Sequence, residues 1–97
     1  MSGNAADPIL NSLREEIAAA DRDLISAFAR RLRVAARIKS HKADQGYELI
    51  DPEREQRLFE TWRQANDGTI SDQALRELFE VVLALSKRET SADSRPA

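Results

Sequence analysis

The residues whose types and spacing could do chemistry lie around one short turn, HKADQGYELIDPEREQ at residues 41–56. Lys42 precedes Gly46 in this stretch, and Asp51, Arg54 and Glu55 follow it. Lysine and arginine side chains bind carboxylates and phosphates, and carboxylates accept hydrogen bonds from hydroxyls or amines. The turn therefore predicts a site for a small anionic molecule that also carries a polar hydrogen-bond donor.

A long helix is predicted before this turn. Asp7 and Pro8 form a helix start, and no Gly or Pro follows until beyond Lys42. Apolar residues recur in steps of three, four or seven at Leu10, Leu13, Ile17, Leu24, Phe28, Ala35 and Ile38. The pattern indicates one amphipathic helix of roughly 35 residues, about 50 Å long.

Two shorter helices are expected after the turn, which gives an all-α fold with three helices per chain. Asp51 caps the second, with Pro52 at its first position, and the run Asn66-Asp67-Gly68 ends it. Ser71 caps the third. The expected apolar faces are Leu58, Phe59, Trp62 and Ala65 on the second helix, and Leu75, Leu78, Phe79, Val82 and Leu85 on the third. We expect a disordered N-terminus at residues 1–7, a helical domain at 8–91 and a disordered tail at 92–97.

The length of the first helix has a geometric consequence. A compact monomer of 97 residues is only about 33 Å across, so a helix of about 50 Å would carry its apolar stripe into water. A second copy of the chain packed along the stripe would cover it, and a homodimer is therefore expected. The alternative is a kink that folds the helix back on itself.

Several polar residues fall on the predicted apolar stripes. Arg31 and Lys42 are eleven residues apart and about 20° apart on the wheel, at the centre of the first stripe. Glu55, Ser86 and Glu89 share the apolar faces of the later helices. One such charge is ordinarily a snorkelling side chain or part of a salt bridge. Several together favour a polar cavity inside a helical bundle, and a cationic cavity of Arg31, Lys42 and Arg54 suits a dicarboxylate.

The composition excludes other classes of site. A third of the residues are charged, 41% are hydrophobic and the net charge is −2, a balance typical of soluble globular proteins. The chain has no cysteine and one histidine, which argues against disulfides, thiolate catalysis and a structural zinc site. It shows no signal-peptide pattern and no apolar window long enough to span a membrane, so we expect a cytoplasmic protein.

The chain resembles the all-α class of chorismate mutase, known as type II. The resemblance covers roughly residues 9–90 and rests on LREEIAAADRDLISAFARRLRVAARIKSHK, then DPERE, then a third helix ending SKRE. Its spacing is specific. Arg31 follows Arg14 by seventeen residues, Lys42 follows by eleven more, Asp51 by nine more, and Arg54-Glu55 come three residues later.

The resemblance implies an intertwined homodimer and the rearrangement of chorismate to prephenate in aromatic amino-acid biosynthesis, without metal or cofactor. It implies that Arg14 enters the partner's site and binds substrate carboxylate together with Arg31. Lys42 would donate to the ether oxygen, and Asp51 and Glu55 would hold the ring hydroxyl. The same resemblance implies that Arg54 adds to the positive field and that Ser86 lines the pocket.

The sequence departs from the family pattern near the end of the third helix. Family members commonly carry a glutamine that donates to the ether oxygen, whereas this register places Thr90 there, after Glu89. Glu89 could turn inward, and it donates only when protonated; alternatively, it pairs with Arg54 or with a lysine of the partner. The related reactions left open are an amino-deoxychorismate mutase, an isochorismate pyruvate lyase, and a weakly active mutase that needs a partner enzyme.

A nucleic-acid-binding helix is an alternative from another class. Residues 30–42, RRLRVAARIKSHK, carry six cations and no acid. Only part of this run faces outward, however, and the rest of the chain is acidic. We therefore expect a small-molecule partner and no nucleic acid or membrane.

Overall fold

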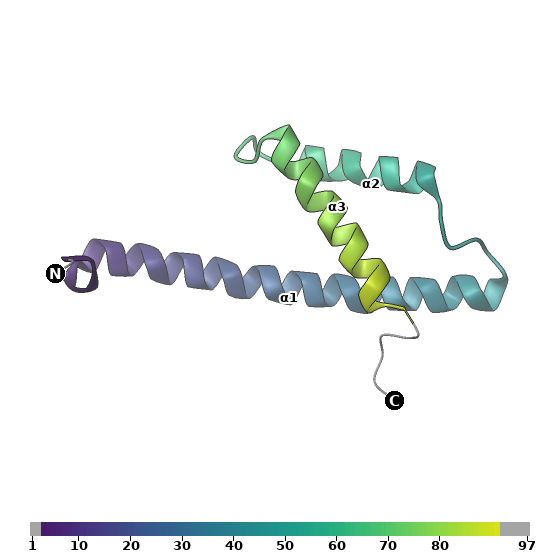
Figure 1. Cartoon of the computed structure of the whole chain (residues 1–97), viewed down its shortest axis with the longest axis horizontal. Helices are drawn as coiled ribbons and strands as arrows, with labels where there is room; N and C mark the ends of the chain where they lie inside the picture. Colours follow the sequence, from purple (N-terminus) through teal and green to yellow (C-terminus); the bar gives the residue numbers. More distant parts are fainter. Residues whose placement is uncertain (1–2, 92–97) are drawn as a thin grey trace, which may run out of the picture. The chain divides into compact units, whose positions relative to one another are not determined.

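The computed structural model describes residues 3–91, which form a short 3₁₀ helix, η1 (Gly3–Ala6), and three α-helices, α1 (Pro8–Gln45), α2 (Pro52–Ala65) and α3 (Asp72–Glu89) (Figure 1). Residues 3–91 contain no strand, so the predicted all-α class with three helices is confirmed. None of the described helices is long and apolar enough to cross a membrane. The predicted tail at residues 92–97 lies outside the described residues.

The chain divides into two compact units, Met1–Arg33 and Val34–Ala97, with the boundary inside α1. Within the first unit, η1 precedes α1. The predicted disorder of residues 1–7 remains a prediction. Asp7 N donates to Asn4 O at 3.3 Å, and Asn11 Nδ2 donates to Ala5 O at 3.1 Å, which ties η1 to the start of α1. The Asp7 side chain caps α1 by accepting from Ile9 N at 2.9 Å and Leu10 N at 3.1 Å. These local hydrogen bonds connect η1 to the first turn of α1.

Five large apolar side chains of the first unit are exposed in the single chain. They are Ile9, Leu13, Ile17, Leu24 and Ile25. Ile17 and Leu24, both on the predicted stripe, are 62% and 61% exposed. Much of the apolar stripe of the first unit is therefore exposed in the single chain.

Local signals end α1 and start α2, as predicted. Gly46 has a positive φ of 72°, Tyr47 N donates to Lys42 O at 2.9 Å, and Gly46 N donates to Ala43 O at 3.3 Å. This pair of bonds is the Schellman motif, which needs a left-handed residue after the helix. A few residues later Asp51 Oδ1 accepts from Arg54 N at 3.1 Å and caps α2.

The predicted end of α2 and start of α3 are also present. Asn66 Oδ1 accepts from Gly68 N at 3.2 Å and from Ile70 N at 3.3 Å, which folds the loop back on itself after Ala65. Gly68 has a φ of 98°, a conformation that favours glycine. Ser71 Oγ then accepts from Ala74 N at 3.2 Å and caps α3.

The core of the second unit lies between α2 and α3. Phe59, Leu75 and Phe79 are its buried residues, and Phe79 is only 3% exposed. The Phe79 ring lies 5.0 Å from that of Phe59 and 5.1 Å from that of Trp62, in tilted and edge-on geometries that aromatic pairs favour. The Arg76 guanidinium lies over the Phe59 ring, 3.8 Å from its centroid, in a cation–π contact.

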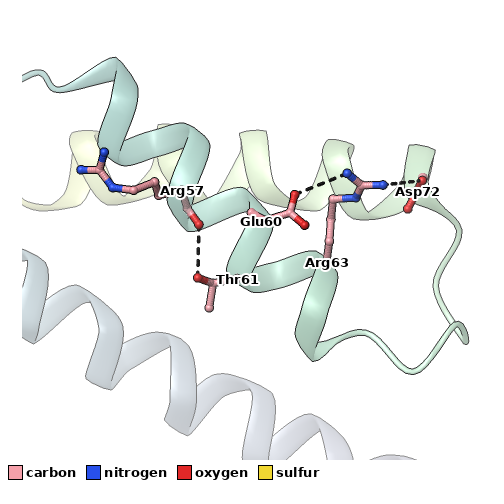
Figure 2. Close-up of polar contacts among 5 residues, drawn as sticks. All are labelled: Arg57, Glu60, Thr61, Arg63 and Asp72. Atoms are coloured by element: carbon pink, nitrogen blue, oxygen red, sulfur yellow. Dashed lines mark hydrogen bonds and ion pairs between the residues drawn. The ribbon is translucent and has the colours of Figure 1, made fainter.

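Polar contacts at the surface join the same two helices (Figure 2). Arg63 on α2 lies 3.4 Å from Glu60 on its own helix and 3.6 Å from Asp72 at the start of α3. The side chains of Arg63 and Asp72 are exposed, so these ion pairs contribute little to stability. Figure 2 also shows Thr61, whose Oγ1 donates back to Arg57 O at 3.2 Å within α2.

Two residues of the apolar faces predicted for α2 and α3 are exposed in the single chain, Ala65 on α2 and Leu78 on α3. Leu78 is 43% exposed. It borders an open hollow together with Trp62 and Leu75. The α2 helix covers the face of α3 that carries Leu75 and Phe79, and this covered face is narrower than the apolar stripe in the sequence.

Candidate ligand-binding site

A pocket of about 300 Å³ lies within the second unit. It is formed by the C-terminal turns of α1, the connection to α2 and the last turn of α3. Its volume is at the lower end of the range for small-molecule sites. The apolar side chains that line it are Ala35, Ile38, Leu49 and Ile50.

The polar lining of this pocket is dominated by lysine. Lys39 and Lys42 come from α1, three residues apart and hence on one face, and Lys87 and Thr90 come from α3 in the same relation. The sequence contains no other lysine. Every ammonium side chain of the protein therefore borders one pocket, which makes the pocket suited to an anion with an apolar body.

Lys42 is the predicted site residue that lies most clearly at this pocket. Its side chain is half-buried, and its Nζ donates to Leu49 O at 3.4 Å across the turn. Lys42 also borders a neighbouring hollow of about 490 Å³, which Asp51 lines as well. The structure thus brings Lys42 and Asp51 to one hollow, although Asp51 Oδ1 already accepts the capping bond from Arg54 N.

Glu55 and Arg54 differ in their surroundings. The Glu55 side chain is 38% exposed, and its Oε1 lies 3.4 Å from Lys87 Nζ. This ion pair links α2 to the α3 lysine that lines the pocket, and the role of Glu55 at the site remains a prediction. Arg54 is exposed, and its backbone N–H serves the helix cap.

The hydroxyl groups at the end of α3 are turned toward their own helix. Thr90 Oγ1 donates to Ser86 O at 2.6 Å, and Ser86 Oγ donates to Val82 O at 2.7 Å. Both residues are buried. Glu89 is exposed, and its Oε2 accepts from Arg88 Nε at 3.2 Å. Glu89 therefore pairs with its neighbour, and not with Arg54, within the described chain.

Arg14 and Arg31 belong to the first unit of the chain. Arg14 is exposed on α1, and Arg31 is half-buried. Both lie on α1, as the sequence predicted. Their contribution to an anion site remains a prediction.

Sequence reasoning missed two residues that line the pocket, Lys39 and Lys87. The sequence analysis selected neither lysine as a site residue. A signal for Lys87 was present, because it precedes Thr90 by three residues and shares its helix face. The scarcity of lysine in a chain with 15 cationic residues was a second signal.

The chain matches the family model of chorismate mutase type II over residues 13–91. The matched range covers most of the chain and includes every predicted site residue from Arg14 to Thr90. No match emerged among curated proteins or among solved structures. The chain belongs to the type II chorismate mutase family.

Proposed function

We propose that this protein is a chorismate mutase that converts chorismate to prephenate, in aromatic amino-acid biosynthesis. The observation that carries the proposal is the pocket of the second unit. Lys42, the predicted donor at the reacting oxygen, lines it together with two further lysines and four apolar side chains. The family match provides the reaction class for this pocket.

The chemistry fits a pocket of this kind. Chorismate carries two carboxylates and an enol ether, and its rearrangement breaks one C–O bond while it forms one C–C bond. The electrons move within the substrate, so no proton, electron or leaving group is exchanged with the protein. The site has to hold the folded conformer and to stabilise negative charge where the ether bond breaks.

In this proposal Lys42 Nζ donates to the ether oxygen. The ammonium now bonds to Leu49 O at 3.4 Å, a long contact that a substrate oxygen can replace at little cost. Ala35, Ile38, Leu49 and Ile50 would enclose the apolar faces of the ring and reduce the dielectric around the reacting bond. Asp51 and Glu55 would accept from the ring hydroxyl, Arg54 would add to the positive field, and Ser86 would support the α3 wall.

The proposal includes a second copy of the chain, with Arg14 of one copy reaching the site of the other and Arg31 acting from the same chain. The support is the uncovered apolar stripe of the first unit, where Leu13, Ile17 and Leu24 are exposed in one chain. Burial of such side chains on the partner stabilises an assembly by about 1.5–3 kcal/mol for each fully covered residue. A homodimer would therefore cover the stripe and bring a carboxylate-binding cation into the site.

The first test is a product assay. Purified protein is incubated with chorismate, and the products are identified by chromatography and mass spectrometry. We expect prephenate, formed at a rate proportional to the protein added. Conversion of amino-deoxychorismate or isochorismate, with chorismate left unchanged, would refute the proposed substrate and point to the related reactions. Failure with all three substrates would refute catalysis by this chain alone.

The shared site has its own test. Arg14→Ala and Arg31→Ala should each be inactive, and a mixture of the two variants should regain part of the activity, because some hybrid dimers contain one intact site. Subunit exchange is verified with differently tagged chains. Exchange without regained activity would refute the contribution of Arg14 across the dimer.

A further inference from the structure

The end of α3 contributes one charged hydrogen-bond donor to the pocket, and it is Lys87. The other polar group from this helix end is Thr90, whose hydroxyl hydrogen is used in the 2.6 Å bond to Ser86 O. Glu89 is exposed beside Arg88. On the α3 side, a ligand in the pocket therefore meets the Lys87 ammonium and the Thr90 hydroxyl. As long as the Thr90 hydroxyl donates to Ser86 O, it can only accept a hydrogen bond from the ligand.

Glu55 holds this ammonium from the adjacent helix. Glu55 Oε1 lies 3.4 Å from Lys87 Nζ, and the Glu55 side chain is more buried than that of Lys87, at 38% against 63% exposed. An ammonium has three N–H donors, so one bond to Glu55 leaves two for a ligand. The ion pair thus limits the rotation of a flexible side chain without using up its donors.

We propose that Lys87 is a second ammonium donor to the bound substrate, acting from α3 opposite Lys42 on α1, and that Glu55 positions it. The inference rests on the proposed function and assigns a residue that the sequence pattern did not select. The pocket then presents hydrogen-bond donors from two helices, and the substrate's carboxylate or ether oxygen lies between them. In this arrangement Glu55 has a positioning role toward Lys87 in addition to any contact with the substrate hydroxyl.

The kinetic test compares Lys87→Gln, Lys87→Arg, Glu55→Gln and the double variant that combines Glu55→Gln with Lys87→Gln. The matched control is Arg88→Gln, which removes the neighbouring cation from the exposed pair with Glu89. Loss of a charge-assisted hydrogen bond should lower kcat/KM about 10- to 100-fold in Lys87→Gln. Lys87→Arg should retain more activity than Lys87→Gln because it keeps a cation, and the control should match the wild type.

The double variant, compared with Glu55→Gln alone, separates a substrate contact from a structural ion pair. If Lys87 only neutralises Glu55, adding Lys87→Gln to Glu55→Gln should leave kcat/KM at the value of Glu55→Gln alone, and this result would overturn the proposal. A Lys87→Gln enzyme within twofold of the wild type would overturn it as well. If the wild type forms prephenate in the same assay, either of these results overturns only the role of Lys87. An inactive wild type overturns the proposed function together with the role of Lys87.

A binding measurement gives a second readout. Because the sequence has three lysines and all of them line the pocket, labelling with ¹³C-lysine yields three side-chain signals that all report on this site. Lys87→Gln assigns one of them by its disappearance. Titration with prephenate should shift the Lys87 signal together with that of Lys42. A Lys42 shift with an unmoved Lys87 signal would contradict contact between Lys87 and the bound molecule.

Discussion

Replacement of Lys42 by Gln separates a catalytic role of this residue from a structural one. The structure predicts a small loss of folding stability and a large loss of kcat. Within residues 3–91 the Lys42 ammonium donates one hydrogen bond, to Leu49 O at 3.4 Å, a distance longer than the usual range for N–H donors. Its loss should therefore cost no more than about 1 kcal/mol of folding stability. For a domain of this size, about 1 kcal/mol lowers Tm by roughly 4–8 °C.

The expected effect on catalysis is larger. Removal of one preorganised donor from the position where charge develops typically lowers kcat about 10²- to 10³-fold, which corresponds to about 2.7–4 kcal/mol. Lys42 lines the pocket from α1 and is half-buried, so water replaces its ammonium incompletely. We therefore expect Lys42→Gln to lose at least a hundredfold in kcat while its helical content stays that of the wild type.

The assay follows the disappearance of chorismate at saturating and subsaturating concentrations, alongside thermal unfolding monitored by circular dichroism. Arg57→Gln is the control, because Arg57 is exposed on α2 and its 3.9 Å pair with Glu53 has little energetic weight. The control should match the wild type in both measurements. A kcat for Lys42→Gln within threefold of the wild type, or a Tm lowered by more than about 15 °C, would refute the reasoning.

Three further predictions concern stability, assembly and pH. Phe79→Ala should destabilise the chain by about 3–5 kcal/mol in urea unfolding, because Phe79 is 3% exposed between two aromatic rings; a loss below about 1 kcal/mol would contradict its place in the core. Leu24→Glu should shift sedimentation from dimer toward monomer, because it places a charge on the uncovered stripe; an unchanged dimer would exclude this face as the interface. Hydrogen bonds from the Thr69 side chain and backbone lower the pKa of Asp67 below its ordinary value of 3.8. The Asp67 carboxylate therefore contributes its full stabilisation at pH values above the ordinary pKa of the group. This stabilisation is lost as the pH falls through the lower pKa of Asp67 in the folded protein. Thr69→Ala should raise the pKa of Asp67 in an NMR titration.

The helix boundaries could be predicted because they depend on nearby residues. Asp51 and Ser71 accept from backbone N–H groups three residues ahead, and Gly46 adopts the left-handed conformation that ends α1. These bonds form within one turn and need no tertiary partner. Local chemistry was therefore sufficient to place the breaks between three helices.

The α3 side of the pocket could not be predicted in the same way. The direction of the Thr90 hydroxyl toward Ser86 O is a rotamer choice, and the pairing of Lys87 with Glu55 depends on how α2 and α3 approach each other. A helical wheel places Glu89 on the apolar stripe, but it does not show that Arg88 lies within reach of the Glu89 carboxylate. Wheel position indicates which face a residue occupies and leaves its partner undetermined.

Catalysis and folding are coupled in this protein if the second copy of the chain is part of the site. Within residues 3–91 the buried apolar residues are Phe59, Leu75 and Phe79, a small core for a domain whose stability is the difference between large opposing terms. The stripe that includes Leu13 and Leu24 remains in water. In the proposed dimer one association covers this stripe and delivers Arg14, so dilution should lower Tm and specific activity together, with a common midpoint. A Tm that depends on protein concentration, combined with activity per chain that does not, would mean that association stabilises the fold without completing the site.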